Sequence, residues 1–329
     1  MGPAPLVDPF GRVVADLRIS VTDRCNLRCT YCMPEDGLAW VPRQELLTFE
    51  EIERVARVCV ERFGVRAIRL TGGEPTVRAD LPALVSRLAA LHVDLSLTTN
   101  GLTLPLVAAE LRRAGLRRIN ISLDTLRPDR FAALTRRDAH ARALAGIEAA
   151  LAAGLDPVKV NCVLMRGVND DEIVDLAEFG RATGVTVRFI EFMPLDADGA
   201  WTVETVVTAD EIVATIGAVH PLEPLAARGN QPAERFRYLD GRGEIGVVAS
   251  VSRSFCSSCD RVRLTAEGMF RNCLFAVRET DLRAVLRGGG TDDAVSEAIR
   301  ADVGGKWAGH AVGQVTFVRP ARSMSQIGG

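Results

Sequence analysis

The residues with the clearest chemical meaning are three cysteines in the run VTDRCNLRCTYCMP: Cys25, Cys29 and Cys32. Thiolates are soft ligands that suit iron–sulfur clusters, zinc or copper(I). A cluster of four irons and four sulfides normally takes four cysteines, so three leave one iron open to a small molecule. A structural zinc site closes its shell with four Cys or His ligands, and no histidine lies near this triplet. Packing of three buried free cysteines is the alternative, but the run is polar and lacks a regular period. The spacing C-x3-C-x2-C therefore predicts an iron–sulfur cluster with an open site.

A second triplet lies in the run FCSSCDRVRLTAEGMFRNCLF, with the spacing C-x2-C-x13-C at Cys256, Cys259 and Cys273. Zinc is the main alternative here, because C-x2-C is a common zinc half-site. A zinc ion would take its fourth ligand from Asp260 or from a remote residue such as Cys162. Thiolate softness also suits iron–sulfur, and again no histidine is nearby. We therefore expect a second cluster with an open site.

The composition describes an ordinary globular chain without a basic field. It has 329 residues, of which 47% are hydrophobic, and a formal net charge of −2, which speaks against nucleic-acid and membrane binding. The first residues, MGPAPLVDPFGR, lack the pattern of a secretory signal, and no run of 18 apolar residues predicts a membrane span. Eight cysteines without a signal predict a cytoplasmic, reducing location and metal binding. Cys59 and Cys162 fit apolar faces and are expected in the core.

Lysine is rare in this chain, since only Lys159 and Lys306 among the 40 basic residues are lysine. Nucleotide bias in the coding genome explains the excess of arginine. Lysine offers a compact point charge where arginine offers a planar fork. Each remaining lysine is thus a candidate for a role that arginine does not fill.

Strand-like and helix-like runs alternate up to about residue 217. The expected strands are 15–21, 65–70, 93–99, 117–123, 157–164 and 186–192, and the expected helices are 50–64, 81–91, 104–113, a stretch that ends at 153, and one that starts at 171. This alternation predicts a parallel sheet with right-handed crossovers. Six such units are fewer than the eight of a full barrel, so we expect a partial (β/α)6 TIM-like barrel over 1–217.

The region 218–329 differs in pattern. The run YLDGRGEIGVVA predicts an antiparallel hairpin, a short helix follows near 281–287, and a second helix follows GGG. We expect an α+β extension that carries the second cysteine triplet and ends in a polar tail.

Distinctive polar residues follow every expected strand of the barrel. The first triplet, TGGEPTVR, TTNG, SLDT, NCVLM and EFMP come after strands one to six in turn. In barrels the carboxyl ends of the strands form the catalytic face. The sequence therefore predicts one active-site rim.

Cationic residues lie on or beside several of these strands. They are Arg18, Arg69, Lys159, Arg188, Arg261 and Arg263. Arg261 and Arg263 flank Val262, and since side chains alternate along a strand, both arginines point the same way. Paired arginines suit a polyphosphate, although a solvated surface charge is the usual state of a single arginine. No G-x4-GK[ST] loop is present, so a nucleotide would not bind in the P-loop manner.

Two motifs resemble those of the radical S-adenosylmethionine (SAM) superfamily. They are the first triplet, with Tyr31 before its last cysteine, and TGGEP. The resemblance implies that Cys25, Cys29 and Cys32 hold a [4Fe-4S] cluster whose open iron is chelated by SAM. It implies that Gly73 and Glu74 lie nearest the SAM amino group. It also implies SAM contacts from Tyr31, Gly73, Ser122 and Met193.

Nearly the whole chain resembles the molybdenum-cofactor biosynthesis protein A family, the GTP 3′,8-cyclases. The likeness rests on both triplets, KVNCVLM, RFIEFMP, DGRGEIG, CDRVRLTAEG and the final Gly328-Gly329. Asp260 stands where many relatives have Asn. The family converts GTP, SAM and a reductant to 3′,8-cyclo-7,8-dihydroguanosine triphosphate, 5′-deoxyadenosine and methionine, the first step of molybdenum cofactor biosynthesis.

For the site, this second resemblance implies that Cys256, Cys259 and Cys273 hold a second [4Fe-4S] cluster whose open iron meets the guanine. It implies that the Gly-Gly tail reaches into the active site. It also implies a set of GTP contacts, namely Arg18, Arg69, Thr99, Lys159, Arg261 and Arg263.

The resemblance also implies partners. They are an electron donor of the flavodoxin or ferredoxin type and the next enzyme, cyclic pyranopterin monophosphate synthase, and the chain is expected to be a monomer or homodimer. Two alternatives stay open at this point. One is a radical SAM peptide maturase with an auxiliary cluster, against which the arginine set speaks. The other is a non-enzymatic electron-transfer or zinc-binding module, which would not bind SAM.

Overall fold

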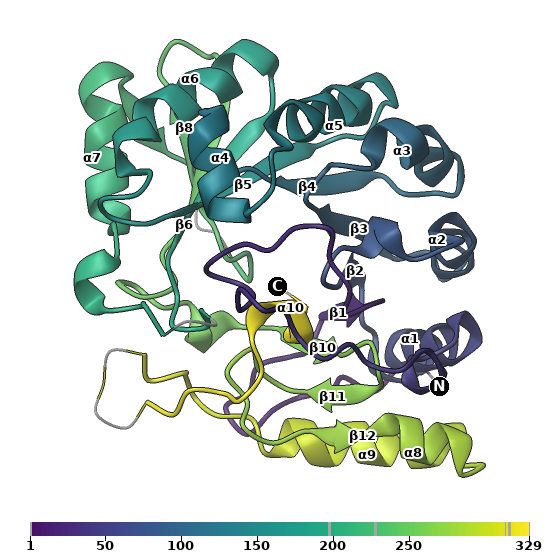
Figure 1. Ribbon diagram of the computed structural model, residues 1–329. Coiled ribbons are helices and arrows are strands. Elements are labelled where there is room, and N and C mark those ends of the chain that lie inside the picture. The colour runs from purple at the N-terminus through teal and green to yellow at the C-terminus, as the bar shows by residue number, and fades with distance from the viewer. Residues whose placement is uncertain (1, 197–198, 227–228, 313, 315–316, 329) are drawn as a thin grey trace.

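The computed structural model describes residues 2–196, 199–226, 229–312, 314 and 317–328 (Figure 1). Within these residues one sheet carries twelve strands in the order β12-β11-β10-β1-β2-β3-β4-β5-β6-β9-β8-β7. The strands are β1 Asp16–Ser20, β2 Ala67–Thr71, β3 Asp94–Thr99, β4 Arg118–Ser122, β5 Val158–Leu164, β6 Thr186–Glu191, β7 Leu222–Pro224, β8 Glu234–Tyr238, β9 Glu244–Val248, β10 Arg261–Leu264, β11 Met269–Arg271 and β12 Thr280–Asp281.

The six predicted barrel strands are confirmed, and β1 to β6 are neighbours in chain order, all parallel. Each strand alternates an apolar outer face with a polar inner face. In β1, Leu17 and Ile19 are fully buried in the core, whereas Arg18 lines the interior cavity. The period of two thus builds a hydrophobic layer under the helices and a polar interior. The predicted partial barrel with a C-terminal extension is confirmed.

Two strands of the C-terminal region extend the parallel part of the sheet. β9 pairs in parallel with β6, and β10 pairs in parallel with β1. The predicted hairpin is confirmed as the antiparallel pair β8–β9. Its parallel pairing with β6 was not predicted, because partners far apart in the chain are chosen by packing rather than by local pattern. The pairing of β10 with β1 attaches the second triplet directly to the first strand of the barrel.

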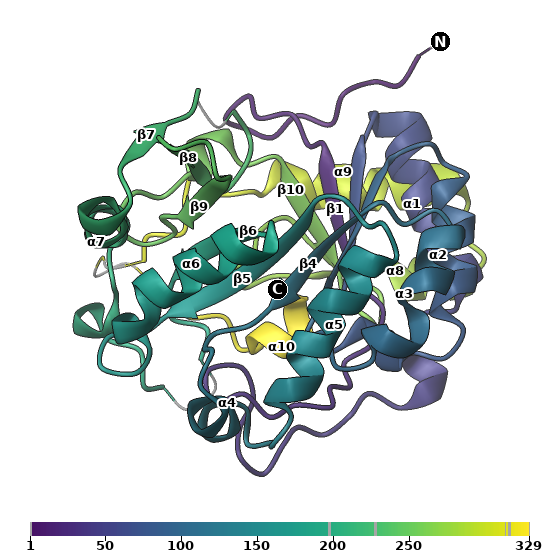
Figure 2. The same cartoon turned by 90° about the horizontal axis from the view of Figure 1, so that it is seen from above.

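Most of the helices cover the outer face of the curved sheet, whereas α10 lies at the mouth of the barrel (Figures 1 and 2). The helices are α1 Phe49–Phe63, α2 Leu81–Ala89, α3 Leu104–Arg113, α4 Pro128–Thr135, α5 His140–Ala152, α6 Ile173–Thr183, α7 Ala209–Val219, α8 Leu282–Arg287, α9 Asp292–Gly304 and α10 Met324–Ile327. The helical stretch expected up to residue 153 is two helices, because Arg136 is left-handed (φ 53°) and ends α4.

Local signals set the ends of the best-defined helix, α1. Thr48 and Glu51 form a capping box at its start, and Gly64 takes the left-handed C-cap position with φ 72°. Ile52, Val55, Cys59 and Phe63 face the core as predicted.

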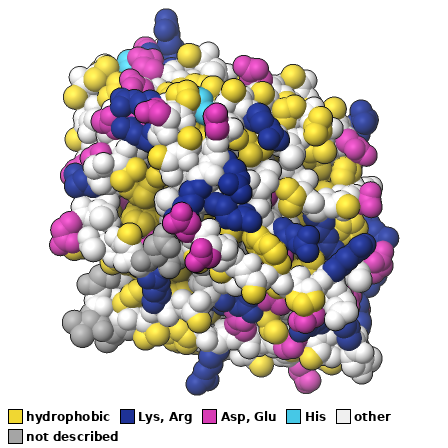
Figure 3. Space-filling model, viewed as in Figure 1, with side chains coloured by type: hydrophobic (Ala, Val, Ile, Leu, Met, Phe, Trp, Pro, Cys, Tyr) yellow, Lys and Arg dark blue, Asp and Glu magenta, His cyan; other side chains and the backbone are white. Residues whose placement is uncertain are grey.

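The outer surface has no dominant charge on the face shown in Figure 3, where basic, acidic and apolar side chains are interspersed. Among the described residues, no helix is both long and apolar enough to cross a membrane.

Candidate active site

A cavity opens at the carboxyl ends of the parallel strands, and both cysteine triplets line it. β10 brings Cys259 beside the first strand of the barrel, since β10 pairs in register with β1. The C-terminal helix α10 lies at the centre of the barrel mouth (Figures 1 and 2). Segments that are far apart in the chain thus enclose one chamber.

The first triplet occupies the loop after β1, and its three cysteines are half-buried. The backbone N–H of Cys32 donates to the carbonyl oxygen of Cys29 (3.0 Å), so the last two cysteines share one tight turn. Burial raises the pKa of the Cys25 thiol to about 11 and that of Cys32 to about 12, and it also raises the pKa of Cys29. Thiolates at this site therefore need a compensating cation, which a metal centre supplies.

The TGGEP strap holds this loop through its backbone. The N–H of Gly73 donates to Thr22 O (2.8 Å), and the N–H of Glu74 donates to Arg24 O (2.7 Å). A Cβ atom on Gly73 would lie 2.4 Å from the carbonyl oxygens of Asp23 and Arg24. Only glycine allows this approach.

Glu74 is buried, and its side chain is used for hydrogen bonds within the protein rather than for a ligand. Its carboxylate accepts hydrogen bonds from Thr99 Oγ1 (2.6 Å), Asn100 N (2.7 Å) and Thr76 N (3.0 Å). Burial nevertheless raises its pKa. Thr99, expected at GTP, lines the cavity but donates its hydroxyl to Glu74, so in this structure it fastens the strap to β3.

The remaining residues expected at SAM line the same side of the cavity: Tyr31, Ser122 and Met193. The hydroxyl of Tyr31 donates to Asp124 Oδ2 (2.6 Å), and Asp124 Oδ1 accepts from Val163 N (2.8 Å). Burial raises the pKa of Asp124 to about 6. Asp124 was not predicted as a site residue, although it belongs to the SLDT run that the sequence analysis placed on the rim.

The second triplet comes from two segments. Cys256 begins a short 3-10 turn (Cys256–Ser258) and Cys259 follows it, while Cys273 comes after β11. Burial raises the pKa of Cys273. At Cys259 burial alone would raise the pKa of the thiol, but the positive charges of Arg261 and Lys306 outweigh burial, and the pKa is lowered. The two triplets thus differ in electrostatic setting.

Three arginines form a row across neighbouring strands of the interior. Arg263 of β10 is in register with Arg18 of β1, which is in register with Arg69 of β2. Adjacent strands are about 4.8 Å apart, and like charges placed directly opposite one another destabilise a sheet. Burial lowers the pKa of all three guanidinium groups. The charge of Arg18 lowers the pKa of Arg69 and Arg263 further, and the charge of Arg261 lowers that of Arg18.

Within the described part of the chain, the Nε atoms of Arg18 and Arg69 are buried without a hydrogen-bond partner. A buried unpaired donor is costly. The arginine row therefore destabilises the folded protein when no ligand is present. An anion that enters the cavity would pair with these arginines and offset that cost.

Two other cations lie deeper in the barrel. Arg188 donates to Asn161 Oδ1 (2.6 and 2.9 Å) and to Asn120 Oδ1 (2.9 Å), and it lines the cavity. Lys159 is one inward position before Asn161 on β5 and does not reach the cavity wall. Burial, then the charges of Arg188 and Arg118, lower the pKa of Lys159 to about 8.

The C-terminal tail enters the cavity beside the arginine row. Met324 and Ser325 line the wall, and Arg263 Nη1 donates to the carbonyl oxygen of Gly328 (2.8 Å). Gly328 has φ +78°, and a Cβ there would lie 2.4 Å from Thr71 Oγ1. Gly329 lies outside the described residues.

The chain matches two family models, one after the other along the sequence. Residues 19–180 match the radical SAM superfamily, and residues 185–312 match Molybdenum Cofactor Synthesis C. The GTP 3′,8-cyclase of Streptomyces coelicolor is 51% identical over 328 residues, which cover 98% of this chain and 96% of the relative.

This chain belongs to the GTP 3′,8-cyclase family of radical SAM enzymes.

Other comparisons agree with this family. GTP 3′,8-cyclase 2 of Mycobacterium tuberculosis is 49% identical, covering 99% of this chain and 92% of the relative. A crystal structure of Streptococcus suis SuiB bound to S-adenosylmethionine has a TM-score of 0.62 over 94% of this chain and 77% of that chain. At 13% identity, SuiB shows a shared fold alone. The resemblance predicted from the motifs is confirmed.

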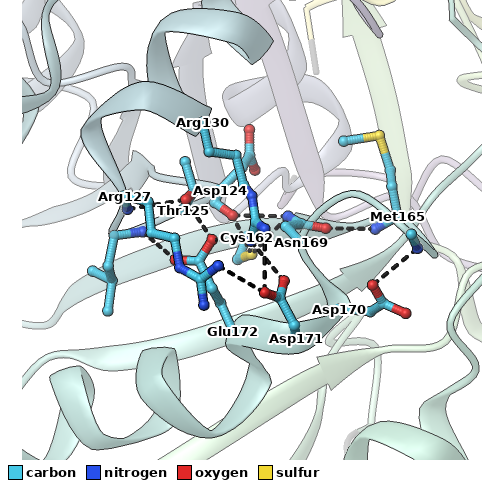
Figure 4. Close-up of polar contacts among 12 residues, drawn as sticks. Asp124, Thr125, Arg127, Arg130, Cys162, Met165, Asn169, Asp170, Asp171 and Glu172 are labelled. Atoms are coloured by element: carbon cyan, nitrogen blue, oxygen red, sulfur yellow. Dashed lines mark hydrogen bonds and ion pairs between the residues drawn. The ribbon is translucent and has the colours of Figure 1, made fainter.

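A buried polar cluster behind the site joins the ends of β4 and β5 in this member of the GTP 3′,8-cyclase family (Figure 4). The Asn169 amide donates to Asp124 O (2.8 Å) and Val163 O (2.9 Å), while its oxygen accepts from Met165 N (2.8 Å). Cys162 is fully buried beside it, and Cys59 is buried in the same core, as predicted. The cluster fixes Asp124, which in turn holds Tyr31.

Gly73→Ala tests the close approach of the strap. We expect the variant to lose the iron of the first site and SAM binding, because the new Cβ meets backbone oxygens that no side-chain rotation can move. Iron analysis and equilibrium SAM binding measure both effects. Gly217→Ala, in α7 with open space around its Cβ, is the control. Normal iron content and SAM affinity in Gly73→Ala would show that the strap tolerates a side chain.

Proposed function

We propose that this chain catalyses the 3′,8-cyclisation of GTP, the first step of molybdenum cofactor biosynthesis, in a cavity that holds SAM at one end and GTP at the other. The observation that carries the proposal is the placement of two open cysteine triplets around one cavity with the row of Arg263, Arg18 and Arg69. Sequence identity of 51% to a cyclase over nearly the full chain supports the same reaction.

The SAM end is built by the first triplet and the TGGEP strap. Cys25, Cys29 and Cys32 would hold a [4Fe-4S] cluster, and the cluster when bound supplies the electron that splits SAM into methionine and a 5′-deoxyadenosyl radical. The N–H groups of Gly73 and Glu74 are engaged with the cysteine loop. The carbonyl oxygen of Glu74 already accepts from Val77 N (3.2 Å), so the carbonyl oxygen of Gly73 is the one placed to accept the SAM amino group, and Ser122 and Met193 border the nucleoside.

The GTP end is built by the second triplet and the arginines. Arg18, Arg69, Arg261 and Arg263 offer charge-assisted hydrogen bonds to the triphosphate. Arg188 is a further cation on the wall that the predicted contact set left out. Lys159, also expected at GTP, is not among the residues that line the cavity and would act from beneath it. The guanine would meet the second cluster at Cys256, Cys259 and Cys273.

Zinc at the second triplet is less well supported than a cluster. Across the described ranges, no three His, Cys, Asp or Glu side chains converge closely enough for a single metal ion. Thiolates on three irons of a cluster stand farther apart than thiolates on one tetrahedral zinc. Asp260, the suggested fourth ligand, is engaged with Asn230 (3.3 Å) and lies near Arg261.

The proposal also includes the cyclised product and two partners. The partners are an electron donor of the flavodoxin or ferredoxin type and the next enzyme, cyclic pyranopterin monophosphate synthase. The protein would act as a monomer or homodimer. The division at 217/218 also stays a proposal, with one sheet running through both parts. The peptide maturase is not favoured, because the likeness to SuiB concerns the fold alone.

The test is an iron and sulfide assay with EPR spectra before and after SAM and then GTP. We expect about eight irons per chain, with SAM changing one cluster signal and GTP the other. Formation of 5′-deoxyadenosine and of the cyclised nucleotide should then both depend on GTP, SAM and a reductant. Zinc at the second site, or a GTP-insensitive spectrum, would overturn the proposal.

A further inference from the structure

Two cations hold the second cysteine loop from behind. Neither Lys306 nor Arg12 lines the cavity, and both are buried, with Lys306 only 4% exposed. The ammonium of Lys306 donates to Arg261 O (2.9 Å) and to Cys259 O (3.3 Å). One lysine thus fixes the backbone on both sides of Asp260.

Arg12 fastens the other end of the same loop. Its Nη1 donates to Cys256 O (2.6 Å) and Ala308 O (2.9 Å), and its Nη2 donates to Trp307 O (2.5 Å). Its Nε is paired with the buried carboxylate of Asp8 (2.5 Å). The segment before β1 therefore ties the loop of Cys256 to the segment after α9.

The loop from Lys306 onward packs directly against the triplet. A Cβ on Gly309 would lie 3.4 Å from Cys256 Cβ and 3.8 Å from its sulfur. His310 lines the cavity, and its ring centroid is 4.8 Å from that of Phe275. Residues 306–310 therefore pack around the second cysteine triplet.

Lys306 has no acidic partner to balance its charge. No carboxylate in the described part of the chain forms an ion pair with it, and the nearby Asp8 is paired with Arg12. Its acceptors are neutral carbonyl oxygens. Burying an ammonium without a counter-charge is costly. The charged groups that act on it are the sulfurs of Cys259 and Cys273 first, and then the ion pair of Arg12 and Asp8.

We propose that Lys306 is a positioning residue for the second cluster, and that its ammonium both anchors the Cys259–Arg261 backbone and stabilises the negative charge of the reduced cluster. The inference rests on the proposed function, because it presumes a cluster at this triplet. It accounts for a lysine in a chain whose other buried cations are almost all arginine, because a compact ammonium reaches the carbonyl oxygens of Cys259 and Arg261 together, whereas a planar guanidinium is larger. Arg12 supports the Cys256 side of the same loop.

Three substitutions at this position separate anchoring from charge. Lys306→Gln keeps N–H donors but removes the charge, Lys306→Met removes both, and Lys306→Arg keeps the charge. We expect the glutamine variant to retain iron, with the midpoint potential of the second cluster shifted downward. We expect the methionine variant to lose iron from the second site, from about eight to about four per chain. The arginine variant should have a potential closer to wild type than the glutamine variant.

The first cluster is an internal control, since its SAM-induced EPR change should persist in all three variants. Arg54→Gln is the matched control variant. Arg54 anchors α1 to Asp292 (2.7 Å) at the start of α9 and does not touch the cysteine loop, so its second cluster should be unchanged. Wild-type iron content and potential in both Lys306→Gln and Lys306→Met would overturn the inference. Zinc in the wild-type site would instead overturn the proposed function.

Discussion

Gly328→Ala is expected to reduce formation of the cyclised nucleotide at least about a hundredfold, while SAM cleavage persists, because a misplacement of about 1 Å in an active site costs that much. Gly328 sits at φ +78°, where a side chain costs about 1 kcal/mol or more. Its Cβ would also lie 2.4 Å from Thr71 Oγ1. The tail would then leave the position in which Gly328 accepts from Arg263.

The measurement is product and 5′-deoxyadenosine quantified in the same reaction. Gly304→Ala, at the end of α9 with open space around its Cβ, is the control for a glycine substitution in the C-terminal region. Deletion of Gly328 and Gly329 should act in the same direction, although Gly329 lies outside the described residues. Normal cyclisation by Gly328→Ala would mean that the tail has no part in the reaction.

Replacing Arg18 and Arg69 together by glutamine is expected to weaken GTP binding strongly and to stabilise the free protein. A hydrogen bond to a charged group is worth about 1.5–3 kcal/mol, so each arginine should contribute roughly ten- to a hundredfold in affinity. The same row costs folding energy, because Arg18, Arg69 and Arg263 repel one another and two of them bury unpaired Nε atoms. Removing two charges relieves that cost.

Equilibrium binding of GTP and of guanosine, with thermal unfolding of the free protein, checks both parts. The loss should be large for GTP and small for guanosine, since the arginines are assigned to phosphate. Arg113→Gln, on the exposed last turn of α3, is the control. An equal loss for guanosine would contradict the phosphate assignment, and a lower unfolding temperature would contradict the strain in the row.

The spacing of apolar and polar residues was enough to predict much of the fold. Alternating apolar and polar residues in runs such as 65–70 set which face of each strand meets the helices, because that period is a local property of the chain. The same alternation placed Arg261 and Arg263 on one face, as the structure shows. The helix break at Arg136 was missed, since nothing in its side chain requires a left-handed backbone.

Local sequence carried less information about what each polar group contacts. Thr99 was expected at GTP but donates to Glu74, and Lys159 lies below the cavity wall. Asp124 and Arg188 line the cavity although neither was assigned a role. His310 also lines the cavity, although it comes 37 residues after Cys273. These contacts depend on how distant segments pack, which a motif does not encode.

The sequence by itself determined the chemistry of this protein: two open thiolate triplets, a strap that must be glycine, and a cationic set without a P-loop. Ligand softness and the absence of a Cβ are properties of residue types, so they can be read without a structure. Only the tertiary structure decided that β10 pairs with β1, which aligns Arg263 with Arg18 and Arg69 and places both triplets on one cavity. Pairing between strands more than 200 residues apart is selected by burial of the whole core, and this pairing also places Lys306 behind the second triplet.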